Sequence, residues 1–155
     1  MSPRGLSLKA RALRYLAMRE HSRAELARKL ARHAEDSPED PAGPRIERLL
    51  DELSAHGLLD EQRAADALVS AQAPRFGAMQ LRQRLRARGV APEAAAAALA
   101  GVAAGEFERA QAVWQRRFGT PAADAAERAR QARFLAGRGF STDVIYRVVR
   151  GLDDT

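Results

Sequence analysis

Apolar residues recur along the chain at the three- and four-residue spacing of amphipathic helices. The clearest stripe consists of Ile46, Leu49, Leu50 and Leu53, and it ends at Gly57, a residue typical of a helix C-terminus. Ala and Leu supply most of the apolar positions, whereas the β-branched and aromatic residues that favour strands are sparse. The pattern therefore predicts an all-α protein.

The same order of helix signals returns about every 50 residues. Leu81–Val90 (LRQRLRARGV) aligns with Gln131–Phe140 (QARFLAGRGF), which places Gly89 on Gly139, and Leu26–His33 is an earlier copy. Each copy contains three helices, and modules this small stack on their neighbours. We predict three tandem three-helix repeats, at 1–57, 58–103 and 104–155, that form an elongated, curved array.

Polar and imino residues mark where these helices begin. Ser22 and Glu25 form a capping box, in which the serine accepts from the amide of Glu25 and the carboxylate reaches back. Asp60 is a good N-cap, and Pro92 suits a first helical turn. The last helix opens at Ser141 or Thr142. Three prolines and several acids in residues 35–44 predict a surface loop.

The composition limits which cellular compartment and which class of protein fit the chain. The 155 residues include no Cys, which excludes disulfides and thiolate sites and fits a reducing compartment. The N-terminal segment is charged, and no apolar run approaches the roughly 18 residues that a membrane span needs. We expect a soluble, cytoplasmic protein that acts as a monomer and has no membrane partner.

Catalytic patterns are missing from the sequence. His21, His33 and His56 have no ligand-pair spacing, and phosphate-loop and nucleophile-elbow motifs are absent. The acidic residues are spread along helices as partners of Arg. We therefore expect no enzymatic activity, no metal site and no cofactor.

The charge points to a polyanionic partner. The formal net charge is +6, and nearly all the cations are Arg, which favours bidentate contacts with phosphate or carboxylate. Basic residues gather on the second helix of each predicted repeat. The candidate contacts are Arg23 and Lys29 in the first repeat, Arg75, Arg82, Arg84, Arg86 and Arg88 in the second, and Arg133 and Arg138 in the third.

A helix-turn-helix DNA reader is an alternative interpretation of the second repeat. Arg75–Gly89 and Pro92–Gly101 are separated by a short turn. The second of these helices, however, is nearly all Ala over Glu93–Ala100, and it offers no side chain to base edges. Non-specific contact with phosphates remains open.

Four stretches in this order resemble the RecX family of regulatory proteins: Ala12–Leu30, Ile46–Val69, Leu81–Val90 and Arg133–Ile145. The most specific motifs are His-Ser-x-x-Glu-Leu at His21–Leu26 and Gly-Leu-Leu-Asp-x-x-Arg at Gly57–Arg63, which adds Arg63 to the candidate contacts. The resemblance implies tandem three-helix repeats.

It further implies a regulator that binds the RecA recombinase filament on DNA. Such proteins suppress the filament's ATP hydrolysis, strand exchange and co-protease activity, which serve recombination, DNA repair and the SOS response. A non-specific DNA-binding helical module that acts on bare DNA is the alternative function.

Overall fold

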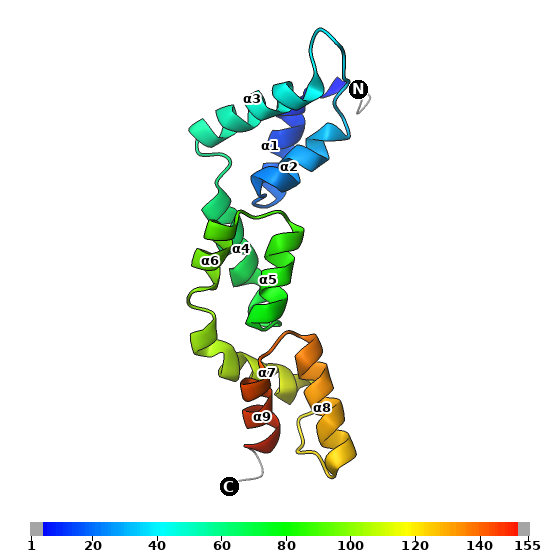
Figure 1. The fold of residues 1–155 in the computed structure, drawn as a ribbon, viewed down its shortest axis with the longest axis vertical. Coiled ribbons are helices and arrows are strands. Elements are labelled where there is room, and N and C mark those ends of the chain that lie inside the picture. Colours follow the sequence, from blue (N-terminus) through cyan, green and yellow to red (C-terminus); the bar gives the residue numbers. More distant parts are fainter. Residues whose placement is uncertain (1–4, 152–155) are drawn as a thin grey trace.

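The computed structural model describes residues 5–151, and its regular elements are helical (Figure 1). One short 3₁₀ turn, Ala103–Gly105, precedes the seventh helix. This described region contains nine α-helices, namely α1 (Leu8–Met18), α2 (Arg23–Ala31), α3 (Ala42–Ala55), α4 (Glu61–Gln72), α5 (Ala78–Ala87), α6 (Pro92–Leu99), α7 (Glu106–Arg117), α8 (Ala125–Gly137) and α9 (Thr142–Arg150).

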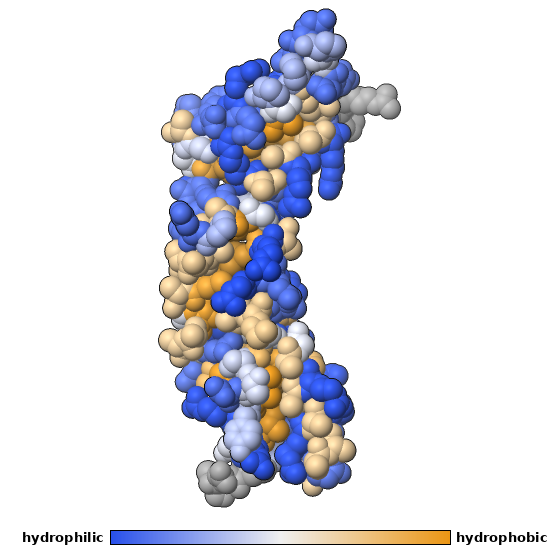
Figure 2. Space-filling view, viewed as in Figure 1, coloured by the Kyte–Doolittle hydropathy of each residue, from blue (hydrophilic) through white to orange (hydrophobic). Residues whose placement is uncertain are grey.

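The helices pack in three consecutive groups of three. The extensive helix–helix contacts all join helices of the same group: α1–α3, α4–α6 or α7–α9. The groups follow one another along the long axis of the molecule, and one edge of its outline is concave (Figures 1 and 2). The predicted all-α fold, an elongated and curved array of three-helix repeats, is confirmed.

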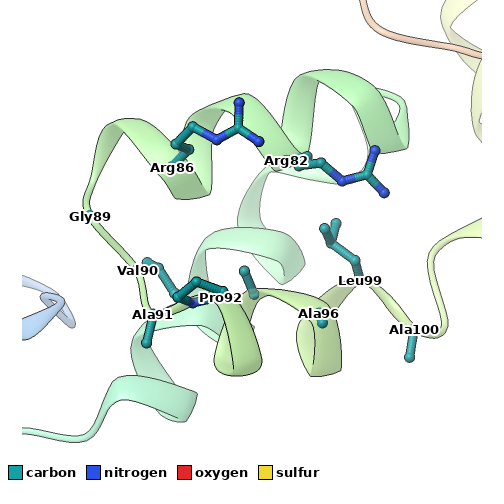
Figure 3. A pocket seen from close by; sticks show the side chains of 10 residues that line it. Arg82, Arg86, Gly89, Val90, Ala91, Pro92, Ala96, Leu99 and Ala100 are labelled. Carbon is teal, nitrogen blue, oxygen red and sulfur yellow. The ribbon is translucent and has the colours of Figure 1, made fainter.

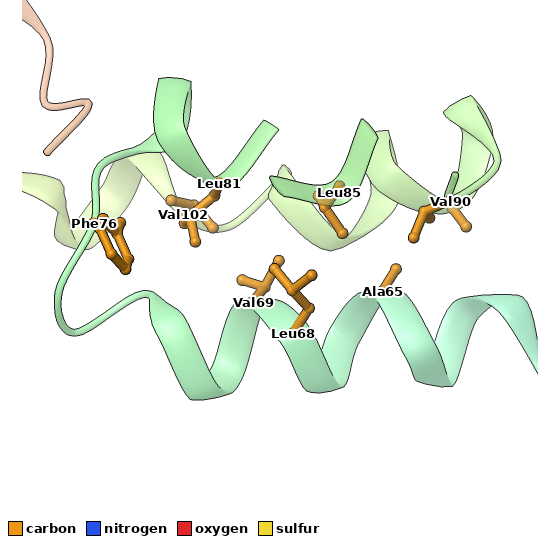
Figure 4. Close-up of a cluster of buried hydrophobic side chains, with 9 residues drawn as sticks. Ala65, Leu68, Val69, Phe76, Leu81, Leu85, Val90 and Val102 are labelled. Carbon is orange, nitrogen blue, oxygen red and sulfur yellow. The ribbon is translucent and has the colours of Figure 1, made fainter. Parts of the chain in front are cut away.

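Each group has its own small hydrophobic core. In the second group, Leu81 and Leu85 of α5 point toward Leu68 and Val69 of α4, and all four side chains are buried (Figure 4). A fully buried leucine of this kind contributes about 2 kcal/mol. In the third group Trp114 is buried, and its indole N–H donates to Gln131 Oε1 at 2.9 Å, which fixes α7 against α8. The protein therefore has three small hydrophobic cores and not a single large one.

The helix ends largely follow the sequence signals. Ser22, Asp60 and Ser141 each accept a hydrogen bond from the third helical residue that follows, as N-caps do. Gly57 and Gly139 have φ of 72° and 86°, a conformation that only glycine adopts without strain.

Two local predictions are partly wrong, although residues 35–41 do form a loop and Ser22 does accept from the amide of Glu25. The predicted loop 35–44 ends early, because α3 begins at Ala42 and Pro44 lies in its first turn, where a missing amide costs nothing. The carboxylate of Glu25 does not reach back to close a capping box. It pairs instead with Arg19, at 2.5 Å.

The second helices of the groups, α2, α5 and α8, are joined end to end. At the first junction, the hydroxyl of Ser22 at the start of α2 donates to the carbonyl oxygen of Arg88 at the end of α5. At the second junction, the N–H of Gly77 at the start of α5 donates to the carbonyl oxygen of Arg138 at the end of α8, at 2.8 Å. Both bonds satisfy a carbonyl that a helix end leaves without a partner.

A glutamate reinforces each junction. Glu61, the first residue of α4, accepts from the N–H groups of Arg23 at 3.0 Å and Ala91 at 2.9 Å. Glu106, the first residue of α7, accepts from the N–H of Ala78 at 2.9 Å. Each carboxylate therefore binds the N-terminus of a second helix, where the helix dipole favours a negative charge. The two junctions are built alike, which fixes a column of second helices.

Candidate partner-binding surface

The structure divides the ten candidate cations into those held by the protein itself and those that face solvent. Arg23 and Arg63 belong to the first kind. Arg23 binds Glu47 at 2.5 Å and Asp51 at 2.8 Å, two acids one turn apart on α3. The Nε of Arg63 donates to Glu20 at 3.0 Å, and its Nη1 donates to the carbonyl oxygen of Gly57 at 2.9 Å. Arg23 thus joins α2 to α3 within the first repeat, and Arg63 joins α4 of the second repeat to two loops of the first.

Lys29 is also held internally, against a buried histidine. Its ammonium lies 2.8 Å from Nε2 of His21, whose Nδ1 lies 3.0 Å from the carbonyl oxygen of Arg19. The two distances fit a neutral imidazole that donates from Nδ1 and accepts at Nε2. Burial, together with the charges of Arg19 and Lys29, lowers the pKa of His21. Burial also lowers the pKa of Lys29.

Arg84, Arg88 and Arg138 are half-buried. The guanidinium of Arg84 lies 3.9 Å from the centroid of the Phe76 ring and donates to Gln72 at 3.2 Å. Arg138 lies 5.4 Å from the same ring. Burial lowers the pKa of Arg88, with Arg19 nearby as a further cause. These arginines pack where the groups meet.

Arg75, Arg82, Arg86 and Arg133 are exposed. Within residues 5–151 their side chains form no hydrogen bond and no ion pair, although Arg75 lies 5.6 Å from the Phe76 ring. Of the cluster that the sequence predicts on α5, only Arg82 and Arg86 present free guanidinium groups at the surface.

These two arginines border an open groove between α5 and α6, which we call the central groove. It has a volume of about 660 Å³, and Ala95, Ala96 and Leu99 of α6 line its other side. Figure 3 shows Arg82 extending from α5 over this apolar floor, with its guanidinium above Leu99, and Arg86 lying one turn further along α5. An apolar floor with a cationic rim suits a partner that carries apolar side chains beside anionic groups.

A second groove lies between α8 and α9, at equivalent positions of the next repeat. We call it the terminal groove, and Tyr146, which is 57% exposed, stands at its edge. The positions that line both grooves differ by fifty in number, with Arg82, Pro92, Ala95, Ala96, Leu99 and Ala100 in the central groove and Ala132, Thr142, Ile145, Tyr146, Val149 and Arg150 in the terminal groove.

Sequence reasoning missed both grooves. The alanines of α6 offer no side chain to base edges, so the sequence pattern points to the basic α5 alone. A usable signal was present, because small residues occupy every face of Glu93–Ala100 and some of them must then be exposed. Ala96 is one of these exposed positions.

Other kinds of site find no support in the described region. No group of three or more His, Asp or Glu side chains between residues 5 and 151 is arranged to hold a metal ion. In the same part of the chain, no helix combines the length and hydropathy needed to cross a bilayer.

Comparisons with known proteins agree on one family. The family profile for the third three-helix domain of RecX matches residues 104–149, and the profile for the first three-helix domain matches residues 9–38. The regulatory protein RecX of Leptothrix cholodnii is 52% identical over 148 residues, which cover 96% of this chain and 90% of that protein. RecX of Ralstonia nicotianae is 49% identical over 148 residues, with coverage of 96% and 89%.

A solved structure shares the fold. The crystal structure of RecX from Lactobacillus salivarius superposes with a TM-score of 0.75 at 20% identity and covers 94% of both chains.

Proposed function

The chain belongs to the RecX family of regulatory proteins, and we propose from that premise that it binds the RecA recombinase filament on DNA and restrains it. The restrained activities are the filament's ATP hydrolysis, strand exchange and co-protease action. The protein acts by binding in the cytoplasm, as a monomer and without a cofactor or chemistry of its own.

The observation that carries this proposal is the repetition of an apolar groove in successive repeats of an elongated molecule. A filament presents the same surface again and again along its length. Two grooves at equivalent positions of neighbouring repeats suit such a partner, because each groove can take the same kind of segment from a different subunit.

Linked weak contacts explain how such a surface can bind tightly. Once one groove is occupied, the other is held close to its own target, so the second contact forms at a high effective concentration. Neither groove then needs a high affinity alone.

The free arginines are proposed as the direct contacts. Arg82 and Arg86 edge the central groove, and Arg75 and Arg133 are exposed near the second junction and on α8. Five of the other candidates, Arg23, Lys29, Arg63, Arg84 and Arg88, support binding through the shape of the array, since their side chains are held by other parts of the protein or half-buried. Arg138 lies between two rings, and its side chain donates to no acceptor between residues 5 and 151.

We also propose that the repeats divide after residues 57 and 103. The hydrophobic clusters of the second and third groups lie within 58–103 and 104–155. Leu59 is an exception, since it packs with the cluster of the first group and extends that repeat's core past the boundary.

The filament-binding proposal and its alternative, a module that binds bare DNA, differ in whether the protein prefers DNA saturated with recombinase over bare DNA. The net charge of +6 and the free arginines also favour a module that binds bare DNA non-specifically. We would label the chain and measure its fluorescence anisotropy with bare single-stranded DNA and with the same DNA saturated with recombinase. Tighter binding to the coated strand supports the regulator. Equal or tighter binding to the bare strand, with a steep dependence on salt, supports the DNA-binding module.

A further inference from the structure

We propose that a hollow at the junction of the second and third repeats binds the phosphates of a single nucleic-acid strand. Its lining consists of Arg75, Val113, Arg116, Arg117, Phe134 and Arg138. This inference rests on the proposed function, in which the partner filament contains such a strand, and it adds that the protein contacts the strand itself. The site is separate from the central groove.

Arginines and phenylalanines alternate around this hollow. Arg138 lies between two rings, 5.4 Å from the centroid of Phe76 in the second repeat and 5.2 Å from that of Phe134 in the third. Beyond them, Arg84 lies 3.9 Å from the Phe76 ring and Arg117 lies 5.3 Å from the Phe134 ring. The stacked series therefore crosses from one repeat to the next.

Stacking fixes these guanidinium groups without using their hydrogen-bond donors. A guanidinium that lies over a ring uses its flat face, so the N–H groups at its edge are left to bind an anion in the bidentate way. Within the described chain, the side chains of Arg75, Arg116, Arg117 and Arg138 donate to no carboxylate and no carbonyl. The donors of Arg75, Arg117 and Arg138, which lie over rings, are thus already oriented, and those of all four arginines have no acceptor within the described chain.

The charge of the hollow is also uncompensated. Four of its six lining side chains are cationic and none is acidic. Like charges at this proximity repel one another, and the ring faces offset only part of that repulsion. An anion bound among them would relieve the repulsion and gain charge-assisted hydrogen bonds.

A nucleic-acid strand fits this charge better than an acidic protein segment does. A strand carries about one negative charge per 3.4 Å of its length, and none of its units is neutral. The arginines come from three separate places, namely the α4–α5 connection, α7 and the residue that follows α8, so they do not lie along one helix face. The apolar floor that would hold a partner helix is reduced to Val113 and Phe134.

Occupation of the hollow should affect how the second and third repeats dock. Arg75 and Phe76 belong to the second group of helices, whereas Arg117 and Phe134 belong to the third. The site is complete only while the two groups are docked. A bound strand therefore stabilises the docked arrangement by the free energy of its binding.

The test uses a fluorescein-labelled oligothymidylate and the full chain. The variant Arg75→Gln/Arg117→Gln removes two of the lining charges. The matched control Arg14→Gln/Arg32→Gln removes the same charge from exposed positions of the first repeat. Affinity is measured by anisotropy over a series of salt concentrations. We expect the lining variant to bind at least about tenfold more weakly, and its salt slope to fall by about 1.4, or ~0.7 per lost phosphate contact. The control should keep the slope of the natural chain.

Three results would overturn the site. The first is an equal loss of affinity for the oligonucleotide in both double variants, which indicates a general effect of charge. The second is displacement of the oligonucleotide by polyglutamate at equal charge, which indicates a site for acidic protein. The third is unchanged affinity in Arg116→Gln, because Arg116 lines the hollow and is stacked on no ring, so that variant does not disturb the fold.

The recombinase ATPase separates this inference from the proposed function. A lining variant that binds the oligonucleotide normally and still inhibits the ATPase overturns the site and leaves the regulator intact. Oligonucleotide binding that depends on the lining, in a protein that does not inhibit the ATPase at all, supports the site and contradicts the regulator.

Discussion

The N–H of Gly77 donates to the carbonyl oxygen of Arg138 at 2.8 Å, and this bond brings the start of α5 against the end of α8. The N–H of Met79 donates to the carbonyl oxygen of the next residue, Gly139, at 3.3 Å. Two backbones can approach this closely because neither Gly77 nor Gly139 has a side chain. The docking of the second and third repeats therefore depends on two glycines.

A methyl group at Gly139 should separate these repeats. Gly139 has φ of 86°, and a Cβ there would overlap the backbone of Gln80. We expect Gly139→Ala to lower the free energy of unfolding by more than about 3 kcal/mol, since backbone strain of about 1–2 kcal/mol is added to a clash that the backbone cannot relieve. Thermal unfolding followed by circular dichroism measures the loss.

Gly57→Ala is the matched control. Gly57 has a similar φ, 72°, but a Cβ there meets open space. Only the strain of about 1–2 kcal/mol should appear. Equal losses in the two variants would show that the approach of the backbones at Gly139 is unimportant.

Neighbouring arginines of α5 should differ in their effect on stability. Arg84 stacks on Phe76 and donates to Gln72, whereas Arg82 extends over the central groove. We expect Arg84→Gln to cost about 1 kcal/mol and Arg82→Gln less than about 0.5 kcal/mol. Urea unfolding of the two variants makes the comparison, and a larger loss from Arg82→Gln would contradict the assignment of the two roles.

Stability should fall as the solution becomes mildly acidic. Burial, with Arg19 and Lys29 nearby, lowers the pKa of His21 in the folded protein. The unfolded chain then binds a proton more readily once the pH falls below about 6.5, so the free energy of unfolding decreases from there down to the folded-state pKa of His21. Unfolding temperatures at pH 7.5 and pH 5.5 should show this decrease.

The variant His21→Gln isolates that histidine. Glutamine keeps a donor and an acceptor but does not titrate, and the exposed His33 and His56 remain in place. The variant should lose most of the difference in unfolding temperature between the two pH values. An unchanged difference would assign the pH dependence to other groups.

The fold could be read from the sequence because its determinants are local and repeated. Stripes of leucine, N-caps such as Ser22 and terminating glycines such as Gly139 each act within a few residues, and the period of about 50 residues repeats them. The exceptions are informative. The sequence predicts a capping box for Glu25, but Arg19, which lies outside the helix, gives the Glu25 carboxylate a better partner.

The candidate site was only partly predictable, because most arginines are held by contacts distant in sequence. Arg63 reaches Glu20, 43 residues earlier, and Arg23 reaches Asp51, 28 residues later. The motifs that resemble the RecX family most specifically, at His21–Leu26 and Gly57–Arg63, both contribute to the first junction. Their residues shape the array, whereas the grooves that we propose as contacts depend on which side chains those junctions leave free.

The most direct test of the account is the single-strand-dependent ATPase of the recombinase, measured while the protein is titrated in at fixed moderate salt and saturating DNA. Arg82→Glu/Arg86→Glu reverses the rim of the central groove without touching an internal contact, and Arg14→Glu/Arg32→Glu is its control. The account predicts that the natural chain and the control inhibit at amounts well below the number of DNA sites, and that the groove variant loses inhibition with its helicity intact. Full inhibition by the groove variant would contradict the assignment of the groove, and no inhibition by the natural chain would contradict the proposed function.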